Sequence, residues 1–344
     1  MDLVEAEDSG LGGPLAVALR SRRRVITMEW DPPAGADADK ALDDLSSLLG
    51  RPAIQGEGRP AQVDSPSLRL AGINVTDGPM ASLRMSPLVF GHLLQQEVGV
   101  QAICHVTCRD RNLLGLQSEL LGAHALGIRA LLALGGDPPH VFQRFPRPGL
   151  AGVYHTDVRG LLELVTHLNQ GQDAWGQPLT GPTRFLVGAA INPGAGWDSW
   201  QTGDEPVRPE KLEAEVAKAR AKMLAGATFF QTQPVFSVRV WLRFREALQA
   251  AGVDVPVIVG LWPLRDARQA HYLQSEVPGT YLPAGLTDRL ERGGRREGER
   301  ILAELAAELA PTVAGFHLFP RNRIAVARRS LELLVQSLEA VDAC

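Results

Sequence analysis

His105-Val106-Thr107-Cys108-Arg109-Asp110 and Leu132-Ala133-Leu134-Gly135-Gly136-Asp137-Pro138-Pro139 are the stretches that decide the fold. Each contains the end of a strand-like segment followed by polar residues, and one helical pattern separates the two. A parallel β-α-β unit brings its strand ends to a common rim, so we expect His105 and Asp137 to reach the same rim. Folds of this kind carry their chemistry at that rim.

Strand-like and helical segments alternate along the chain on both sides of these stretches. The predicted strands cover residues 25–30, 68–76, 102–107, 130–134, 184–191, 228–233, 255–261 and 313–319. The predicted helices cover residues 38–49, 87–98, 113–126, 158–169, 209–224, 238–250, 265–276 and 323–338. Strict alternation with eight strands predicts an α/β fold, a closed (β/α)8 TIM barrel.

The remaining length is assigned to additions on this barrel. Residues 1–20 are predicted to be an N-terminal extension, and residues 21–344 a single barrel domain. A helical insertion is expected before the last strand, around residues 286–309. Its stretch 293–298 is charged and rich in glycine, which predicts an exposed turn between two helices.

Composition limits the classes of partner. The chain has 344 residues, and its 35 basic and 39 acidic residues give a net charge of -4. This balance leaves no extended basic surface, so we expect neither nucleic acid nor a membrane as partner. Three cysteines are too few for a disulfide framework, and no signal peptide or long apolar span is visible. We therefore expect a cytoplasmic protein.

Glu29 is a candidate general acid. Alternation along the first strand places Val25, Thr27 and Glu29 on one face. A carboxyl group in the apolar mouth of a barrel holds its proton near neutral pH, because burial disfavours the charged form. Spacing alone favours a plainer interpretation, a rim glutamate paired with an arginine.

Cys104, His105 and Cys108 resemble a metal-binding spacing, but the geometry of a strand argues against one. Residues four apart in a strand lie about 13 Å apart, so both thiols cannot reach one zinc ion. We therefore expect no metal site. On its own pattern, His105 is most simply a core histidine with satisfied hydrogen bonds.

Other polar residues have both a functional and a structural interpretation. Asp137 lies among glycines and prolines that permit close approach of a flat ligand, although turn chemistry explains the same pattern. Gln231 and Gln233 share one strand face with Phe229, which predicts either a ligand with amide-like edges or a buried network. No P-loop, G-x-G-x-x-G, H-E-x-x-H or G-x-S-x-G motif occurs.

Taken together, the short motifs resemble the methylenetetrahydrofolate reductases, a family of flavoprotein (β/α)8 barrels, from Val25 to about Leu334. The resemblance is carried by Met28-Glu29-Trp30-Asp31-Pro32-Pro33, Asn74-Val75-Thr76-Asp77-Gly78, His105-Val106-Thr107-Cys108, Gly136-Asp137-Pro138, Thr232-Gln233, Gly260-Leu261-Trp262-Pro263 with Gln269, and Asn322-Arg323. Residues 109–113 and 122–124 also resemble the branch fused to a homocysteine methyltransferase domain. We see no counterpart of that domain here and expect a stand-alone barrel.

This resemblance implies FAD-dependent reduction of 5,10-methylenetetrahydrofolate to 5-methyltetrahydrofolate, a step of one-carbon metabolism and methionine biosynthesis. By resemblance, Glu29 is the acid that protonates N10 of the folate and opens its five-membered ring to an iminium, which hydride from reduced flavin then reduces. Asp137 matches an aspartate near the flavin and the pterin. Gln233, Gln269 and Arg323 match folate-side positions.

The family's FAD-binding positions are only partly retained. The residues expected to bind the cofactor are Thr76, His105, Gly136, Asp137, Asn192, Glu215 and Lys222. The departures are Gly135 for an arginine, Asn192 for a tyrosine, Gly196 for a histidine, Ala221 for a second basic residue, and Leu273 for a phenylalanine that stacks on folate or nicotinamide. The resemblance still implies FAD.

The electron donor implied is NADH, NADPH or a protein reductant, and the expected state is a homo-oligomer. Two other functions stay open. One is a folate- or flavin-binding barrel without turnover that serves as a subunit of a larger one-carbon complex. The other is a barrel lyase that acts without flavin.

Overall fold

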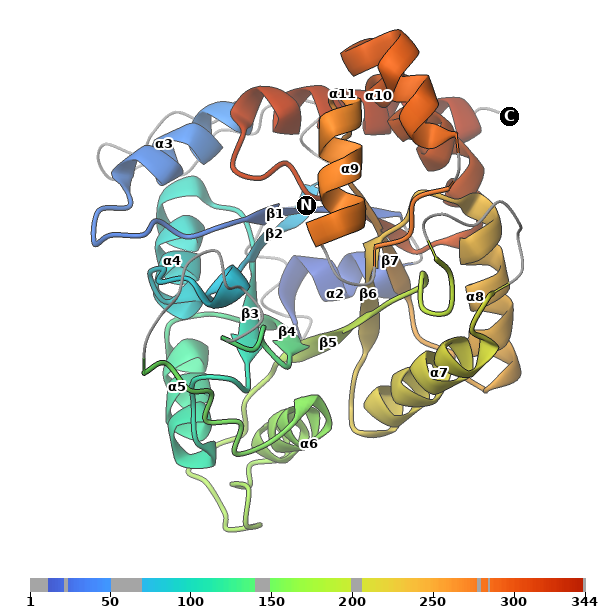
Figure 1. Ribbon diagram of the computed structural model, residues 1–344. Coiled ribbons are helices and arrows are strands. Elements are labelled where there is room, and N and C mark those ends of the chain that lie inside the picture. The colour runs from blue at the N-terminus through green and yellow to red at the C-terminus, as the bar shows by residue number, and fades with distance from the viewer. Residues whose placement is uncertain are drawn as a thin grey trace.

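Eight parallel strands close into a barrel in the order β1-β2-β3-β4-β5-β6-β7-β8, and β8 pairs with β1 (Figure 1). This computed structural model describes residues 12–21, 24–50, 70–139, 149–198, 206–276, 280–283 and 285–342. The strands are β1 (Val25–Trp30), β2 (Leu70–Val75), β3 (Ala102–Thr107), β4 (Ala130–Leu134), β5 (Leu186–Ile191), β6 (Phe229–Pro234), β7 (Val257–Leu261) and β8 (Gly315–Leu318). The predicted (β/α)8 barrel is confirmed.

Helices surround the barrel, as the alternation predicts. They are α2 (Gly13–Arg20), α3 (Asp39–Leu48), α4 (Pro87–Leu93), α5 (Leu113–Ala125), α6 (Val158–Asn169), α7 (Pro209–Leu224), α8 (Val238–Ala250), α9 (Ala267–Glu276), α10 (Leu286–Leu309) and α11 (Ile324–Asp342). Side-chain oxygens of Asn112, Asp157 and Ser237 cap α5, α6 and α8 by accepting a backbone N–H three residues on. No helix within the described ranges is both long and apolar enough to cross a bilayer.

The alternation predicted for the first strand is present in β1. Ile26, Met28 and Trp30 point outward into the main apolar cluster, where the helices pack against the strands. Val25 belongs instead to a second apolar cluster, formed by residues at the start of several strands and by α2. Glu29 therefore lies on the inward-facing side, near the carboxyl end of its strand.

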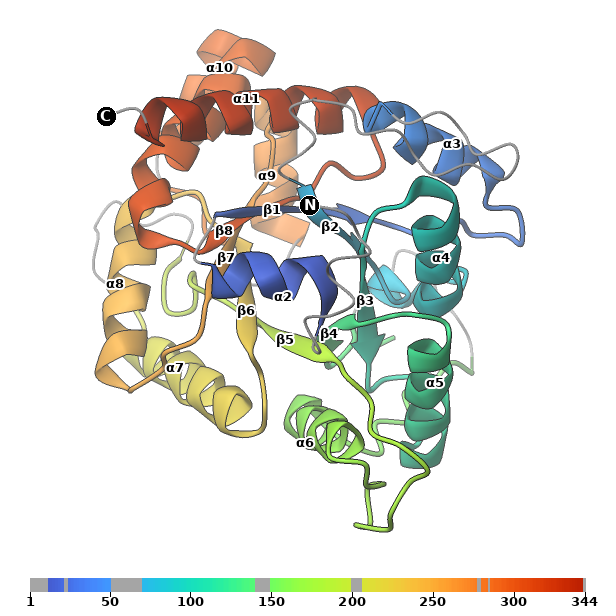
Figure 2. The ribbon, with the colours of Figure 1, turned by 180° about the vertical axis from the view of Figure 1, so that it is seen from behind.

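Helix α2 closes the amino-terminal end of the barrel, and Figure 2 shows it lying across that end. Leu15 is fully buried against the inner cluster. The Gln101 amide ties the helix down, because its Oε1 accepts from the backbone N–H of Leu15 at 2.7 Å and its Nε2 donates to the Gly12 carbonyl at 2.7 Å. Part of the predicted N-terminal extension is thus the floor of the barrel, and the opposite end is its mouth.

Helix α10 is the expected insertion before the last strand, with the predicted bounds. The prediction of an exposed turn at residues 293–298 is wrong for the second half of this stretch. The chain kinks at Gly294 and then resumes the helix, and Glu297 and Gly298 are buried. Glu297 forms ion pairs with Arg289 and Arg300, at 2.6 and 2.8 Å. Gly298 packs so closely that a Cβ there would lie 1.8 Å from the Leu264 carbonyl oxygen.

Candidate functional site

Glu29 sits at the mouth of the barrel and is partly buried. Burial raises the pKa of Glu29 to about 8, the negative charges of Asp31 and Asp137 raise it further, and Arg321 opposes the shift. The carboxyl group therefore keeps its proton at neutral pH. Such a group is equipped for general acid catalysis.

Asp137 is exposed on the turn after β4. Its Oδ2 accepts a hydrogen bond from the backbone N–H of Met80 at 2.8 Å. The preceding Gly136 has φ +85, and a Cβ there would lie 2.8 Å from the Cβ of Arg109, so both conformation and space require glycine. At Gly135, by contrast, a Cβ would meet nothing nearer than Val158, at 3.9 Å.

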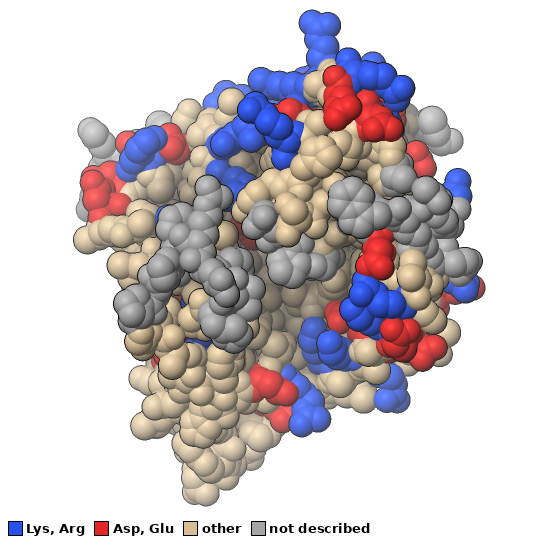
Figure 3. Space-filling view, viewed as in Figure 1, with Lys and Arg blue, Asp and Glu red and all other residues tan. Residues whose placement is uncertain are grey.

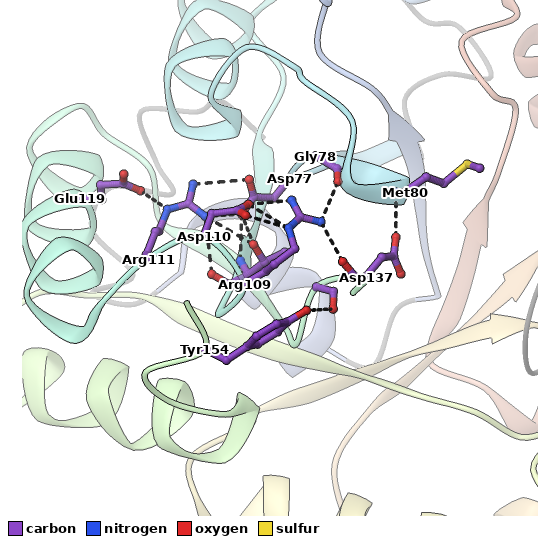
Figure 4. A network of polar contacts seen from close by, with 11 residues as sticks. Asp77, Gly78, Met80, Arg109, Asp110, Arg111, Glu119, Asp137 and Tyr154 are labelled. Carbon is purple, nitrogen blue, oxygen red and sulfur yellow. Dashed lines mark hydrogen bonds and ion pairs between the residues drawn. The ribbon is translucent and has the colours of Figure 1, made fainter. Parts of the chain in front are cut away.

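Two arginines join the loops that follow β2, β3 and β4 (Figure 4). The Arg109 guanidinium, only 4% exposed, pairs with Asp110 and donates to the carbonyl oxygens of Gly78 at 3.1 Å and Asp137 at 3.4 Å. Arg111 pairs with Asp77 and with Glu119, each at 2.6 Å. These contacts fix the backbone beneath Asp137. The signals for them in the sequence are the charged residues at 109–111 and the motif at residues 74–78, which contains Asp77 and Gly78.

His105 lies in the barrel interior, below the exposed Asp137. Asn74 Nδ2 is 3.1 Å from His105 Nε2 and donates to Gln231 Oε1 at 3.0 Å, while His317 Nδ1 lies 2.8 Å from Thr27 Oγ1. Burial lowers the pKa of His105 to about 4, and burial together with repulsion from His105 holds the pKa of His317 well below 6.5. Both imidazoles are neutral. We expected His105 and Asp137 to reach the same rim. Only Asp137 does so, because His105 lies in the middle of β3.

The two glutamines of β6 have different surroundings. Gln231 is buried in the network with Asn74, which is the structural interpretation of the pattern. Gln233 is exposed, because the register of β6 against β7 shifts between Gln231 and Pro234. Its amide is available to a ligand at the mouth.

Cys104 and Cys108 form no metal site with His105. Cys104 Sγ donates to the carbonyl oxygen of Pro87 at 3.3 Å, and burial raises the pKa of the Cys108 thiol to about 11. Within the described ranges, no three His, Cys, Asp or Glu side chains are grouped closely enough to hold a metal ion.

Three predicted cofactor-binding residues gather at the end of β5. Lys222 Nζ donates to the carbonyl oxygen of Ala190 at 2.7 Å, and Glu215 Oε1 accepts from the backbone N–H of Asn192 at 3.0 Å. Burial lowers the pKa of Lys222, against the opposing effect of Glu215. Thr76 is buried closer to Glu29, where its hydroxyl donates to Asp31 Oδ1 at 2.7 Å.

A cavity of about 490 Å³ opens between the loops after β7 and β8 and contains both remaining predicted residues, Gln269 and Arg323. It is lined by Pro263, Arg265, Asp266, Arg268, Gln269, Tyr272, Phe319, Pro320, Arg321, Arg323 and Val326. Four arginines against one aspartate make it basic. Leu273 is fully buried in an apolar cluster with residues of α10 and does not line the cavity, whereas the neighbouring Tyr272 does.

Comparison with known proteins gives a family match. The family model for methylenetetrahydrofolate reductase matches residues 65–332. The probable methylenetetrahydrofolate reductase (NADH) of Oryza sativa subsp. japonica is 25% identical over 269 residues, which cover 78% of this chain and 40% of the rice protein. The 5,10-methylenetetrahydrofolate reductase of Escherichia coli (strain K12) is 28% identical over 240 residues, 67% of this chain and 69% of that protein. The matched part is thus about two fifths of the plant relative.

Among solved structures, an uncharacterized protein from Clostridium thermocellum matches with a TM-score of 0.57 and 13% sequence identity. The match covers 94% of this chain and 98% of that one. That protein binds two copies of 5-methyl-5,6,7,8-tetrahydrofolic acid. At this level of identity the likeness concerns the fold alone.

Proposed function

Because this chain belongs to the methylenetetrahydrofolate reductase family, we propose that it reduces 5,10-methylenetetrahydrofolate to 5-methyltetrahydrofolate, with FAD as cofactor and Glu29 as general acid. The observation that carries the proposal is the carboxyl group of Glu29, which stays protonated at neutral pH at the barrel mouth. An acid in that state can donate a proton to a substrate nitrogen without first acquiring one.

The residues around the mouth suit a folate. The exposed amide of Gln233 can donate to and accept from the edges of a pterin ring. The arginines of the cavity suit the carboxylates of the glutamate tail, because guanidinium groups bind carboxylates with paired hydrogen bonds. Asp137, on its rigid turn, keeps a fixed negative charge near Glu29 and so helps the acid retain its proton.

The donor set at the ends of β2, β4 and β5 fits FAD. Lys222 is an amine whose charged form is disfavoured by burial, so it would gain from an anionic phosphate. Gly135 leaves the end of β4 without a side chain, which permits the approach of a flat ring. Thr76, Asn192, Glu215 and Lys222 are the residues that would hold the cofactor. When bound and reduced, FAD supplies the hydride.

The test is the substitution Glu29→Gln, followed by rapid kinetics on each half-reaction. Reduction of the flavin should be unchanged, while oxidation by methylenetetrahydrofolate should slow by about 10²- to 10⁴-fold, the usual contribution of a general acid. Glu246→Gln, at a side chain 71% exposed on α8, is the matched control and should change neither rate. Equal losses in both half-reactions of Glu29→Gln would rule out the acid role.

The same anaerobic experiment identifies the electron donor. NADH, NADPH and a protein reductant are each added before the folate, and the competent donor bleaches the flavin absorbance. A barrel that binds methyltetrahydrofolate but whose flavin is not reoxidised by methylenetetrahydrofolate would instead be a binding subunit. We further propose a cytoplasmic homo-oligomer, which light scattering of the purified protein and cell fractionation test.

A further inference from the structure

The turn between β8 and α11 has an unusual backbone. Arg321 and Asn322 both lie in the left-handed region, with φ of 54 and 53. Asparagine tolerates this conformation, whereas for arginine it is uncommon and costs energy. Such strain persists only where the surroundings impose it, and it gathers at functional sites.

Asn322 pins this turn to the end of the strand that carries Glu29. Its Oδ1 accepts from the backbone N–H of Asp31 at 2.8 Å, and its Nδ2 donates to the carbonyl oxygen of Asp31 at 2.8 Å. Thr76, directly after β2, donates a hydrogen bond from its hydroxyl to the carboxylate of Asp31. The last and first strands of the barrel are therefore joined beside the acid.

Aromatic rings support the Arg321 side chain. Its guanidinium carbon lies 5.7 Å from the centre of the Trp262 ring, a cation–π distance. Trp262 in turn stacks on Phe319, with ring centres 5.5 Å apart and planes inclined by 20°. Arg321 is exposed and lines the basic cavity, so its charge is held at the mouth and is open to substrate.

The charges that face Glu29 come from three elements. Asp31 lies directly after β1, Asp137 lies on the turn after β4, and Arg321 lies on the turn after β8. Of these three, only Arg321 is positive. When Glu29 gives up its proton, its carboxylate therefore forms in a partly buried position under the influence of two other carboxylates.

We propose that Arg321 is a positioning residue for the acid: the turn bonded to Asp31 holds its guanidinium over the Trp262 ring, from where it pairs with the Glu29 carboxylate left after proton donation. In this step the O–H bond of Glu29 breaks, the proton goes to the substrate nitrogen and the electron pair stays on the carboxylate. Solvent then restores the proton. The inference rests on the function proposed for Glu29.

Arg321→Leu and Arg321→Lys test this pairing through the pH profile of the folate half-reaction. Loss of the cation raises the pKa of Glu29. In Arg321→Leu the alkaline limb, which is the fall of the rate at high pH, should therefore move to higher pH by about one pH unit. The plateau rate should fall about tenfold because a weaker acid donates its proton less readily. Lysine keeps the charge, so Arg321→Lys should keep the limb close to its wild-type position.

Arg323→Leu is the control for charge in the same cavity. It should raise KM for the folate and leave the alkaline limb in place. Arg296→Leu, at an exposed position on α10, controls for net charge and should change neither quantity. If the limb of Arg321→Leu stays at the wild-type pH, or if Arg323→Leu moves it as far, Arg321 does not act on Glu29.

A direct titration separates this proposal from the proposed function. Carbon-13 NMR of glutamate-labelled protein identifies the Glu29 carboxyl signal as the one missing in Glu29→Gln, and it requires no turnover. A Glu29 signal that titrates at higher pH in Arg321→Leu than in wild type supports the pairing even if wild-type protein fails to reduce folate. If folate is reduced but the titration of that signal is unchanged, the pairing is wrong and the function stands.

Discussion

At the scale of single residues, the polar side chains of this barrel fall into two groups. Those of the interior, such as Asn74, His105 and Gln231, are bonded to one another and shape the space below the mouth. Those of the mouth, such as Asp137 and Gln233, keep exposed polar atoms. Residue type and alternation predicted that these positions are polar and inward. They could not predict which of these residues lie in the interior and which lie at the mouth. That depends on how far along its strand each residue lies and on one shift in the register of β6.

Lys222 gives a prediction at this scale. Lys222→Ala should weaken FAD binding by about 10- to 100-fold, since a hydrogen bond to a charged group is worth about 1.5–3 kcal/mol. Fluorescence titration of the flavin-free protein with FAD measures the change. Lys218→Ala is the matched control, because Lys218 lies one turn earlier on α7 with its side chain 67% exposed. Equal affinities in the two variants would place Lys222 outside the cofactor site.

At the scale of elements, hydrophobic periodicity predicted most boundaries, and β1, β3, β4, α6, α7, α8 and α10 have the predicted bounds. The features it missed depend on contacts between elements. Helix α2 is only eight residues long, and its position on the barrel floor depends on the Gln101 side chain. The left-handed turn at Arg321 and Asn322 depends on bonds to a strand almost 300 residues earlier. No local pattern contains that information.

Gly298 provides a test of the packing of α10. Gly298→Ala should destabilise the protein by about 1–3 kcal/mol, because the new Cβ meets the Leu264 backbone, which cannot rotate away. Urea unfolding followed by circular dichroism measures this. Gly122→Ala on α5, where a Cβ meets nothing within 4 Å, should instead stabilise by about 0.5–1 kcal/mol. Equal unfolding midpoints for the two variants would contradict the close contact.

At the scale of the whole molecule, we expect two neutral histidines at the centre of the barrel to limit its stability in acid. Folding lowers the pKa values of His105 and His317. Below pH 6.5 these histidines therefore bind protons in the unfolded chain but stay neutral in the folded chain. The free energy of unfolding therefore has its full value, as far as these histidines are concerned, above pH 6.5. It decreases as the pH falls from 6.5 towards about 4. Each contributes a slope of about 1.4 kcal/mol per pH unit in that window.

Urea unfolding at a series of pH values between 8 and 5 measures this slope. His105→Asn removes one of the two groups, so it should make the dependence of the unfolding free energy on pH less steep. His167→Asn, at the last turn of α6, removes a histidine from outside the barrel interior and should leave the slope unchanged. A slope that is the same in His105→Asn and in wild type would show that His105 does not set the acid limit.

The bonds that join Asp31 to Asn322 and Thr27 to His317 have a consequence for folding kinetics. Their partners are 291 and 290 residues apart, so each of these bonds closes a loop that contains most of the chain. Contacts of such separation carry a large entropic cost and form late. A nascent chain therefore holds the complete strand of Glu29 long before it holds the turn that completes the surroundings of Glu29. The chemistry proposed for the mouth should therefore become available only when β8 closes the barrel against β1, and truncated or partly folded chains should lack it.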